Sequence, residues 1–197
     1  MIFRNDDLSF GIDVDKYKKV QEVFEEFGIK EMYSVIPCGK NIYVPNTHML
    51  SKEKEDELTG FNYVSDDGDV STFIRDSIKR GHSISLHGWR HINIANYGYD
   101  EQYDKIKRAK GFLEDIYGQK IEYFIPPYNS YNKYTVLICK RLGMKILDYG
   151  GNQLEKLVEK NKLPIKTDYN WYHAWRFFEG NLTIDKLRLW LKDQQSA

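Results

Sequence analysis

The feature that most constrains the fold of this chain is a regular alternation of short apolar segments with amphipathic segments of helical periodicity. It begins with an apolar opening from Ile2 to about Asn5 and continues with residues 15–28, where apolar side chains recur at helical spacing until Gly28 supplies a stop. Strand-like segments follow at 30–37, 82–88, 121–127, 144–150 and 170–178, and helical ones at 69–81, 100–118, 132–143 and around 184–191. This alternation predicts parallel strands with crossover helices, in an open sheet or a closed barrel.

The length of the chain fits a single domain over residues 1–197. A chain of 197 residues can bury a sufficient core without disulfides. Cys38 and Cys139 lie far apart among apolar neighbours, which predicts two small core residues. Residues 38–66 are polar and irregular, and their charge run "SKEKEDE" is typical of a solvated face. Neither GxGxxG nor GxxxxGK[ST] occurs, so nothing favours nucleotide binding through those loops.

Charge and hydropathy exclude several classes of partner. The 29 basic and 29 acidic side chains cancel, which argues against a general nucleic-acid or anionic-membrane binder. No apolar run reaches the roughly 18 residues of a membrane span, and "MIFRNDDLSF" does not look like a secretory signal. The sequence therefore predicts a cytoplasmic protein with no membrane span. The sequence does not decide between a monomer and a homo-oligomer.

Polar groups follow the predicted strands where those strands end. In parallel α/β folds the reactive groups collect at the carboxyl ends of the strands, so these groups are expected on one face. They are Asp6 with Asp7, His87 with His91, the segment 126–129, Asp148, and His173 inside the last strand.

The aspartate and histidine pairs together suit a metal ion. Adjacent carboxylates raise each other's pKa, which a bound cation relieves. Two imidazoles and one carboxylate form a site used by zinc hydrolases and non-haem iron enzymes, and His87 and His91 could face one ion if "HGWRH" coils after its strand. Each group also has a simpler explanation. The Asp pair could cap a turn, and His173 could be a packed core residue.

Three segments resemble motifs of the polysaccharide deacetylases (the NodB-homology group, carbohydrate esterase family 4). "FRNDD" resembles the first motif, whose usual form is close to TFDDG, and "HGWRH" resembles the second, a histidine pair. "FIPPYNSYN" resembles the third, often RPP followed by an aromatic residue. Their order and intervals match those of the family, and the resemblance spans nearly the whole chain.

The resemblance implies an α/β fold, namely an irregular (β/α) barrel of about seven parallel strands. It also implies an enzyme that removes N-acetyl groups from sugars. It assigns one divalent metal ion to Asp7, His87 and His91. Zinc suits these ligands best, and cobalt, nickel or iron fit them too.

The resemblance also assigns the reacting groups. Asp6 would be the general base, the backbone N–H of Tyr128 an oxyanion donor, and His173 the general acid. Aromatic side chains near these groups could be platforms for sugar rings, although core packing is the simpler explanation for at least half of them. They are Trp89, Tyr128, Trp171 and Trp175.

The third motif departs from the family pattern. Ile125 stands where an arginine usually positions the base. Arg4, just before "NDD", is a candidate substitute and is assigned with Asn129 to substrate binding. The first motif continues with Leu-Ser where the family often has Gly.

Three functions follow from these assignments. The leading one is metal-dependent N-deacetylation of a sugar or sugar-containing precursor of a cell-surface polysaccharide. The second is hydrolysis of another small amide on the same scaffold. The third is an inactive glycan-binding module, favoured by Ile125 and the abundance of tryptophan and tyrosine.

Overall fold

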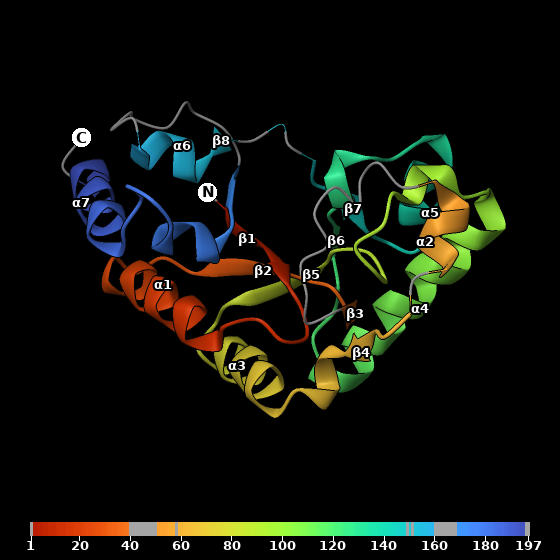
Figure 1. The fold of residues 1–197 in the computed structure, drawn as a ribbon, viewed down its shortest axis with the longest axis horizontal. Coiled ribbons are helices and arrows are strands. Elements are labelled where there is room, and N and C mark those ends of the chain that lie inside the picture. The colour runs from red at the N-terminus through yellow and green to blue at the C-terminus, as the bar shows by residue number, and fades with distance from the viewer. Residues whose placement is uncertain are drawn as a thin grey trace.

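The computed structural model describes residues 2–39, 51–57, 59–148, 150, 152–159 and 169–195. Seven strands form one parallel sheet in the order β7-β6-β5-β2-β1-β9-β8. Figure 1 shows that this sheet is curled. They are β1 (Ile2–Leu8), β2 (Glu31–Val35), β5 (Ser83–Leu86), β6 (Tyr123–Phe124), β7 (Lys145–Ile146), β8 (Asn152–Gln153) and β9 (Tyr169–Tyr172). A separate antiparallel pair joins β3 (Cys38–Gly39) to β4 (Asn62–Tyr63). The predicted parallel, barrel-like α/β fold is confirmed.

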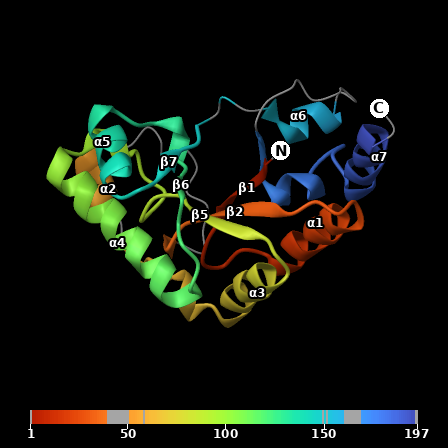
Figure 2. The same ribbon diagram turned by 180° about the vertical axis from the view of Figure 1, so that it is seen from behind.

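Helices lie around the outside of this sheet (Figures 1 and 2). Asp13, Asp67 and Asn132 cap the starts of three of them by accepting hydrogen bonds from backbone N–H groups of the first turn. Across the described residues, no helix is both long and apolar enough to cross a membrane. The helices are α1 (Val14–Glu26), α2 (Lys52–Glu57), α3 (Gly68–Lys79), α4 (Tyr99–Tyr117), α5 (Lys133–Arg141), α6 (Leu154–Glu159) and α7 (Ile184–Gln195).

The last three predicted strands are shorter than expected. Within 121–127, only Tyr123–Phe124 is a strand. Within 170–178, β9 ends at Tyr172, because the backbone N–H of Ala174 donates to Asn5 Oδ1 and the chain then coils into a 3₁₀ helix over Ala174–Phe178. Within 144–150, only Lys145–Ile146 pairs with β6, and Tyr149 lies outside the described residues.

Other local differences concern segments with little periodicity. The predicted irregular segment 38–66 contains α2 and the β3–β4 pair, while its residues 40–50 and 58 lie outside the described part of the chain. The short elements β8 and α6 were not predicted, because two residues of strand and six of helix are too few to show a period.

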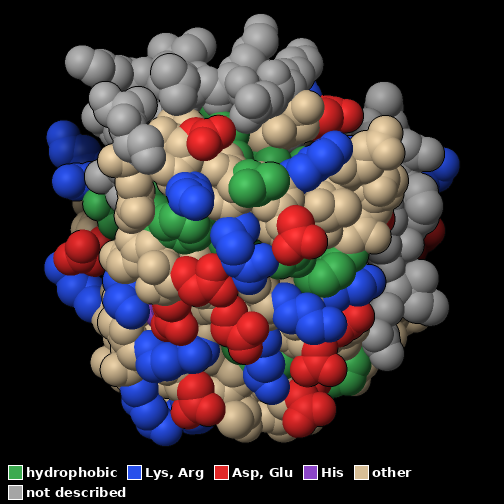
Figure 3. All heavy atoms as spheres, turned by 90° about the vertical axis from the view of Figure 1, so that its left-hand side faces the viewer, with side chains coloured by type: hydrophobic (Ala, Val, Ile, Leu, Met, Phe, Trp, Pro, Cys, Tyr) green, Lys and Arg blue, Asp and Glu red, His purple; other side chains and the backbone are tan. Residues whose placement is uncertain are grey.

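The outer face formed by α1 and α7 carries intermixed charges (Figure 3). Arg188 of α7 donates to Glu26 of α1 at 2.7 Å and 3.0 Å. It also lies 3.1 Å from Asp185. No patch of a single sign is visible on this face, which agrees with the balanced composition.

Glu31 is a buried carboxyl group on the helix-facing side of β2. Its side chain accepts hydrogen bonds from the hydroxyl groups of Tyr33, at 2.8 Å, and of Tyr172. Burial raises its pKa to about 8. The folded protein therefore holds Glu31 as the neutral acid at mildly acidic pH.

We expect Glu31→Gln to flatten the dependence of stability on pH. A carboxyl group whose folded pKa is raised destabilises the fold as pH rises from its unfolded pKa of about 4.3 to its folded value, and a pKa difference of one is worth about 1.4 kcal/mol. Urea unfolding between pH 5 and 9 should show wild type losing stability towards pH 8 relative to the variant. Parallel profiles for the two proteins would mean that Glu31 ionises without cost.

Candidate metal centre and active site

The site begins where β1 ends. The pairing of β1 with β2 shifts register between Asn5 and Leu8, and Asp7 adopts φ +66°, which is uncommon for a residue other than glycine. The predicted strand end near Asn5 therefore lies three residues early, since β1 runs to Leu8 through both aspartates. The irregularity interrupts the alternation of side chains at this point.

Asp6 is buried and its carboxylate is held by three donors. Arg4 Nε donates to Oδ1 and Arg4 Nη2 to Oδ2, both at 2.8 Å, while Ser34 Oγ donates to Oδ1 at 2.7 Å. Arg4 and Asp6 are 0% and 1% exposed. This two-pronged pairing fixes the orientation of the carboxylate as well as its charge.

Arg4 also reaches across the sheet. Its Nη1 donates to the backbone carbonyls of Leu147 at 3.1 Å and Asp148 at 3.2 Å, just beyond β7. The predicted role of Arg4 in substrate binding does not fit a side chain that is fully buried against Asp6. Ile125, at the position where an arginine was expected, has a fully buried apolar side chain, so Arg4 is the residue that holds Asp6.

The segment 87–91 turns back on itself without forming a helix. Gly88 has φ +76°, and a Cβ there would lie 2.7 Å from the carbonyl oxygen of Arg90. The N–H of Ile92 donates to that same carbonyl at 2.9 Å. The expected helical coil of "HGWRH" is therefore replaced by a glycine-dependent turn, which still brings the two histidine rings to a centroid distance of 5.0 Å.

Three histidines surround the Asp7 carboxylate. His87 Nε2 lies 3.1 Å and His91 Nε2 3.3 Å from Asp7 Oδ1. The candidate ligand atoms of Asp7, His87 and His91 all lie within 4.8 Å of one another. His173 Nε2 is 3.5 Å from Asp7 Oδ2, on the other carboxylate oxygen.

The protonation pattern of this cluster suits a cation. His87 Nδ1 lies 2.9 Å from the carbonyl oxygen of Ile125, so Nδ1 carries a proton and Nε2, which faces Asp7, is the atom that could bind a metal. Burial alone would raise the pKa of Asp7, but the charge of His91 and hydrogen bonds from His87 and His91 outweigh it and hold that pKa well below its usual range. An ionised carboxylate faced by the Nε2 atoms of two imidazoles would fit a divalent transition metal such as zinc once those nitrogens lose their protons to bind it.

Three of the four side chains in this cluster are partly exposed. The side chain of His87 is 1% exposed, whereas those of Asp7, His91 and His173 are 24%, 29% and 18% exposed. A ligand can therefore approach past His91 and His173 while His87 stays in the protein interior.

Two half-buried tryptophans flank His173. The ring centroids of Trp171 and Trp175 lie 5.9 Å and 5.4 Å from that of the histidine. Across the site, Tyr128 packs edge-on against His91 at 4.3 Å. Tyr128 and Asn129 both adopt φ +56° in the turn that follows β6. The structure thus brings the predicted aromatic groups other than Trp89 to the histidines.

Trp89 points away from this cluster. It is 8% exposed and packs against Tyr63 and Phe112, with the guanidinium of Arg108 over its ring at 4.2 Å. Its predicted role as a sugar platform does not fit this packing. Ser34 and the carbonyl of Ile125 also support the site, and neither could be predicted from the sequence, because a buried serine and a backbone carbonyl leave no motif.

The family model described as polysaccharide deacetylase matches residues 15–147 of the chain. The matched range contains His87, His91 and the turn at Tyr128. Asp6 and Asp7 lie before it and His173 lies after it.

Solved structures of family 4 carbohydrate esterases share the fold. One from Streptomyces lividans, in complex with acetate, has a TM-score of 0.70 and 11% identity, over 100% of this chain and 88% of that one. An acetyl xylan esterase from Clostridium thermocellum, in complex with a cobalt ion, has a TM-score of 0.65 and 15% identity, over 99% and 83%.

A CE4 family pseudoenzyme from Bacillus anthracis also shares the fold. It has a TM-score of 0.68 and 12% identity, over 99% of this chain and 60% of that one, so the chain spans about three fifths of its length. No curated protein is similar enough in sequence to count as a relative.

Proposed function

Because the chain belongs to the polysaccharide deacetylase family, we propose that it is a metal-dependent hydrolase that removes an N-acetyl group from a carbohydrate, with residues 1–197 as one catalytic domain. The observation that carries the proposal is the cluster of Asp7, His87 and His91, with their ligand atoms within 4.8 Å of one another. The buried pair of Asp6 and Arg4 beside it supports a reaction rather than binding alone.

Asp7, His87 and His91 would hold the ion. A divalent metal at this position supplies Lewis-acid polarisation of the acetyl carbonyl and lowers the pKa of bound water. The hydrogen bond from His87 Nδ1 to the Ile125 carbonyl keeps one ligand oriented before any metal arrives.

The remaining residues would carry the proton transfers. Asp6 would remove a proton from the attacking water, with its carboxylate aimed by Arg4 and Ser34. The backbone N–H of Tyr128 would donate to the developing oxyanion.

His173 would protonate the leaving amine, since it lies beside Asp7 at the open side of the site. Trp171 and Trp175, on either side of it, offer half-buried rings for a sugar face.

A second candidate function is carbohydrate binding without turnover. The pseudoenzyme among the structural neighbours and the apolar Ile125 favour it. The candidate metal ligands, together with the two hydrogen bonds from Arg4 to Asp6, favour the hydrolase.

The test is acetate release from N-acetylated chito-oligosaccharides, with O-acetylated xylan as the comparison substrate. We expect acetate from the N-acetylated substrate, loss of activity after chelation, and recovery when zinc is added back. Saturable oligosaccharide binding with no acetate from either substrate, with metal present, would favour the binding module instead.

A further inference from the structure

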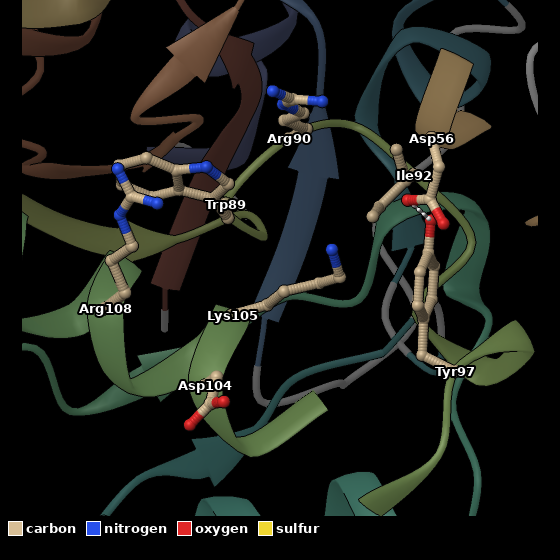
Figure 4. Close-up of a pocket in the computed structure, with 8 residues that line it drawn as sticks. All are labelled: Asp56, Trp89, Arg90, Ile92, Tyr97, Asp104, Lys105 and Arg108. Atoms are coloured by element: carbon tan, nitrogen blue, oxygen red, sulfur yellow. Dashed lines mark hydrogen bonds between the residues drawn. The ribbon is translucent and has the colours of Figure 1, made fainter. Parts of the chain in front are cut away.

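A pocket of about 210 Å³ lies beside the turn that joins His87 to His91 (Figure 4). Trp89 and Arg90 line it from that turn, and Lys105 and Arg108 line it from α4. None of Asp7, His87 and His91 lines it. A ligand could therefore bind in this pocket whether or not the chain is a hydrolase.

Three cations line this pocket, namely Arg90, Lys105 and Arg108. Among the described residues, none of them forms a direct ion pair with a carboxylate, although Lys105 acts on Glu101 at longer range. Each lies over an aromatic ring, a contact that does not neutralise the positive charge, and Arg108 also donates to the Tyr63 hydroxyl at 3.4 Å. The pairs are Arg90 over Phe61 at 4.0 Å, Arg108 over Trp89 at 4.2 Å, and Lys105 over Tyr97 at 4.6 Å.

Arg90 has an unsatisfied donor at this site. Its Nε is buried and finds no hydrogen-bond acceptor within the described residues. Buried donors of this kind are rare in native proteins and mark a missing acceptor. The acceptor would come from a ligand of negative charge.

The two acidic residues of the pocket do not fill this role. Asp56 accepts a hydrogen bond from the Tyr97 hydroxyl at 3.1 Å. Figure 4 shows Asp104 at the far end of the view from Arg90, with its carboxylate turned away from Lys105. The carboxylates therefore leave the cationic side of the pocket open.

We propose that this pocket binds a phosphate group, carried by a phosphorylated sugar or present as free phosphate. Two guanidinium groups and an ammonium group match a phosphate better than a single carboxylate. The volume is several times the roughly 30 Å³ of a water molecule, which leaves room for part of an attached group. Because Arg90 lies between His87 and His91, a bound phosphate would link the turn that carries these histidines to α4.

The test is isothermal titration of inorganic phosphate into the purified chain at constant ionic strength. We expect saturable binding by wild type and at least about tenfold weaker binding by a Lys105→Gln/Arg108→Gln variant, since charge-assisted bonds to phosphate are lost. Arg90→Lys, which keeps the charge and the turn, should weaken binding by a smaller factor. Lys186→Gln on the distant helix α7 is the matched control and should bind as wild type does.

Two further arms separate the alternatives. Phosphate held by a metal ion would be lost in Asp7→Asn and kept in the Lys105→Gln/Arg108→Gln variant, and that result would overturn the proposal. So would the absence of saturable binding by wild type. A phosphomonoester of N-acetylglucosamine that binds more tightly than inorganic phosphate identifies a sugar phosphate as the ligand, and equal affinity identifies the free ion.

Discussion

Asp6→Asn is expected to lower acetate release by roughly 10²- to 10⁴-fold, the usual contribution of a general base. The change removes the proton acceptor while keeping the shape of the side chain, so the loss should fall on kcat more than on KM. The measurement is steady-state acetate release from an N-acetylated oligosaccharide, with both proteins loaded with zinc.

The control for this variant is its metal content. Asp6 is not among the candidate ligand atoms of Asp7, His87 and His91, so Asp6→Asn should hold as much metal as wild type. A variant that keeps its metal and also keeps most of its turnover would exclude Asp6 as the base.

Arg4→Met is expected to destabilise the fold by about 3–5 kcal/mol, the usual effect of removing one partner from a buried ion pair. The substitution removes two of the three hydrogen bonds to the Asp6 carboxylate and leaves the one from Ser34. It also removes the hydrogen bonds from the guanidinium to the carbonyls of Leu147 and Asp148. Urea unfolding measures the change in the free energy of unfolding.

The double variant Arg4→Met/Asp6→Asn separates the ion pair from packing. If the charge of Asp6 causes most of the loss, the double variant should be more stable than Arg4→Met alone. Arg4→Lys should rescue stability only in part, because an ammonium group cannot make the two-pronged contact. Equal losses in the single and double variants would instead point to the cavity left by the guanidinium.

The order of the elements could be predicted because their periodicities are strong. The helix over 69–81 has apolar residues on one side and a glycine at its end, and the structure has α3 at Gly68–Lys79. Strands of two residues, such as β7 and β8, carry no such signal. Their pairing depends on neighbours that are remote in sequence, and periodicity does not report these.

The candidate ligands could be found because a histidine pair and an aspartate pair have fixed local spacings. The groups that orient the site could not be predicted in this way. The clamp on Asp6 joins Arg4 to carbonyls 143 and 144 residues away, and the expected arginine position holds Ile125. For Trp89, in contrast, the position in the sequence predicted a place in the site that does not fit the structure. This residue lies between the two histidines in the sequence, yet the turn at Gly88 sends its side chain to α4.

The most direct test of the metal centre is the metal content of the purified chain, measured by elemental analysis with and without prior incubation in zinc. We expect close to one transition-metal ion per wild-type chain and almost none in a His87→Ala/His91→Ala variant that remains folded. Negligible metal in both proteins after incubation with zinc would contradict the proposed metal site, and the cluster around Asp7 would then be held by hydrogen bonds alone.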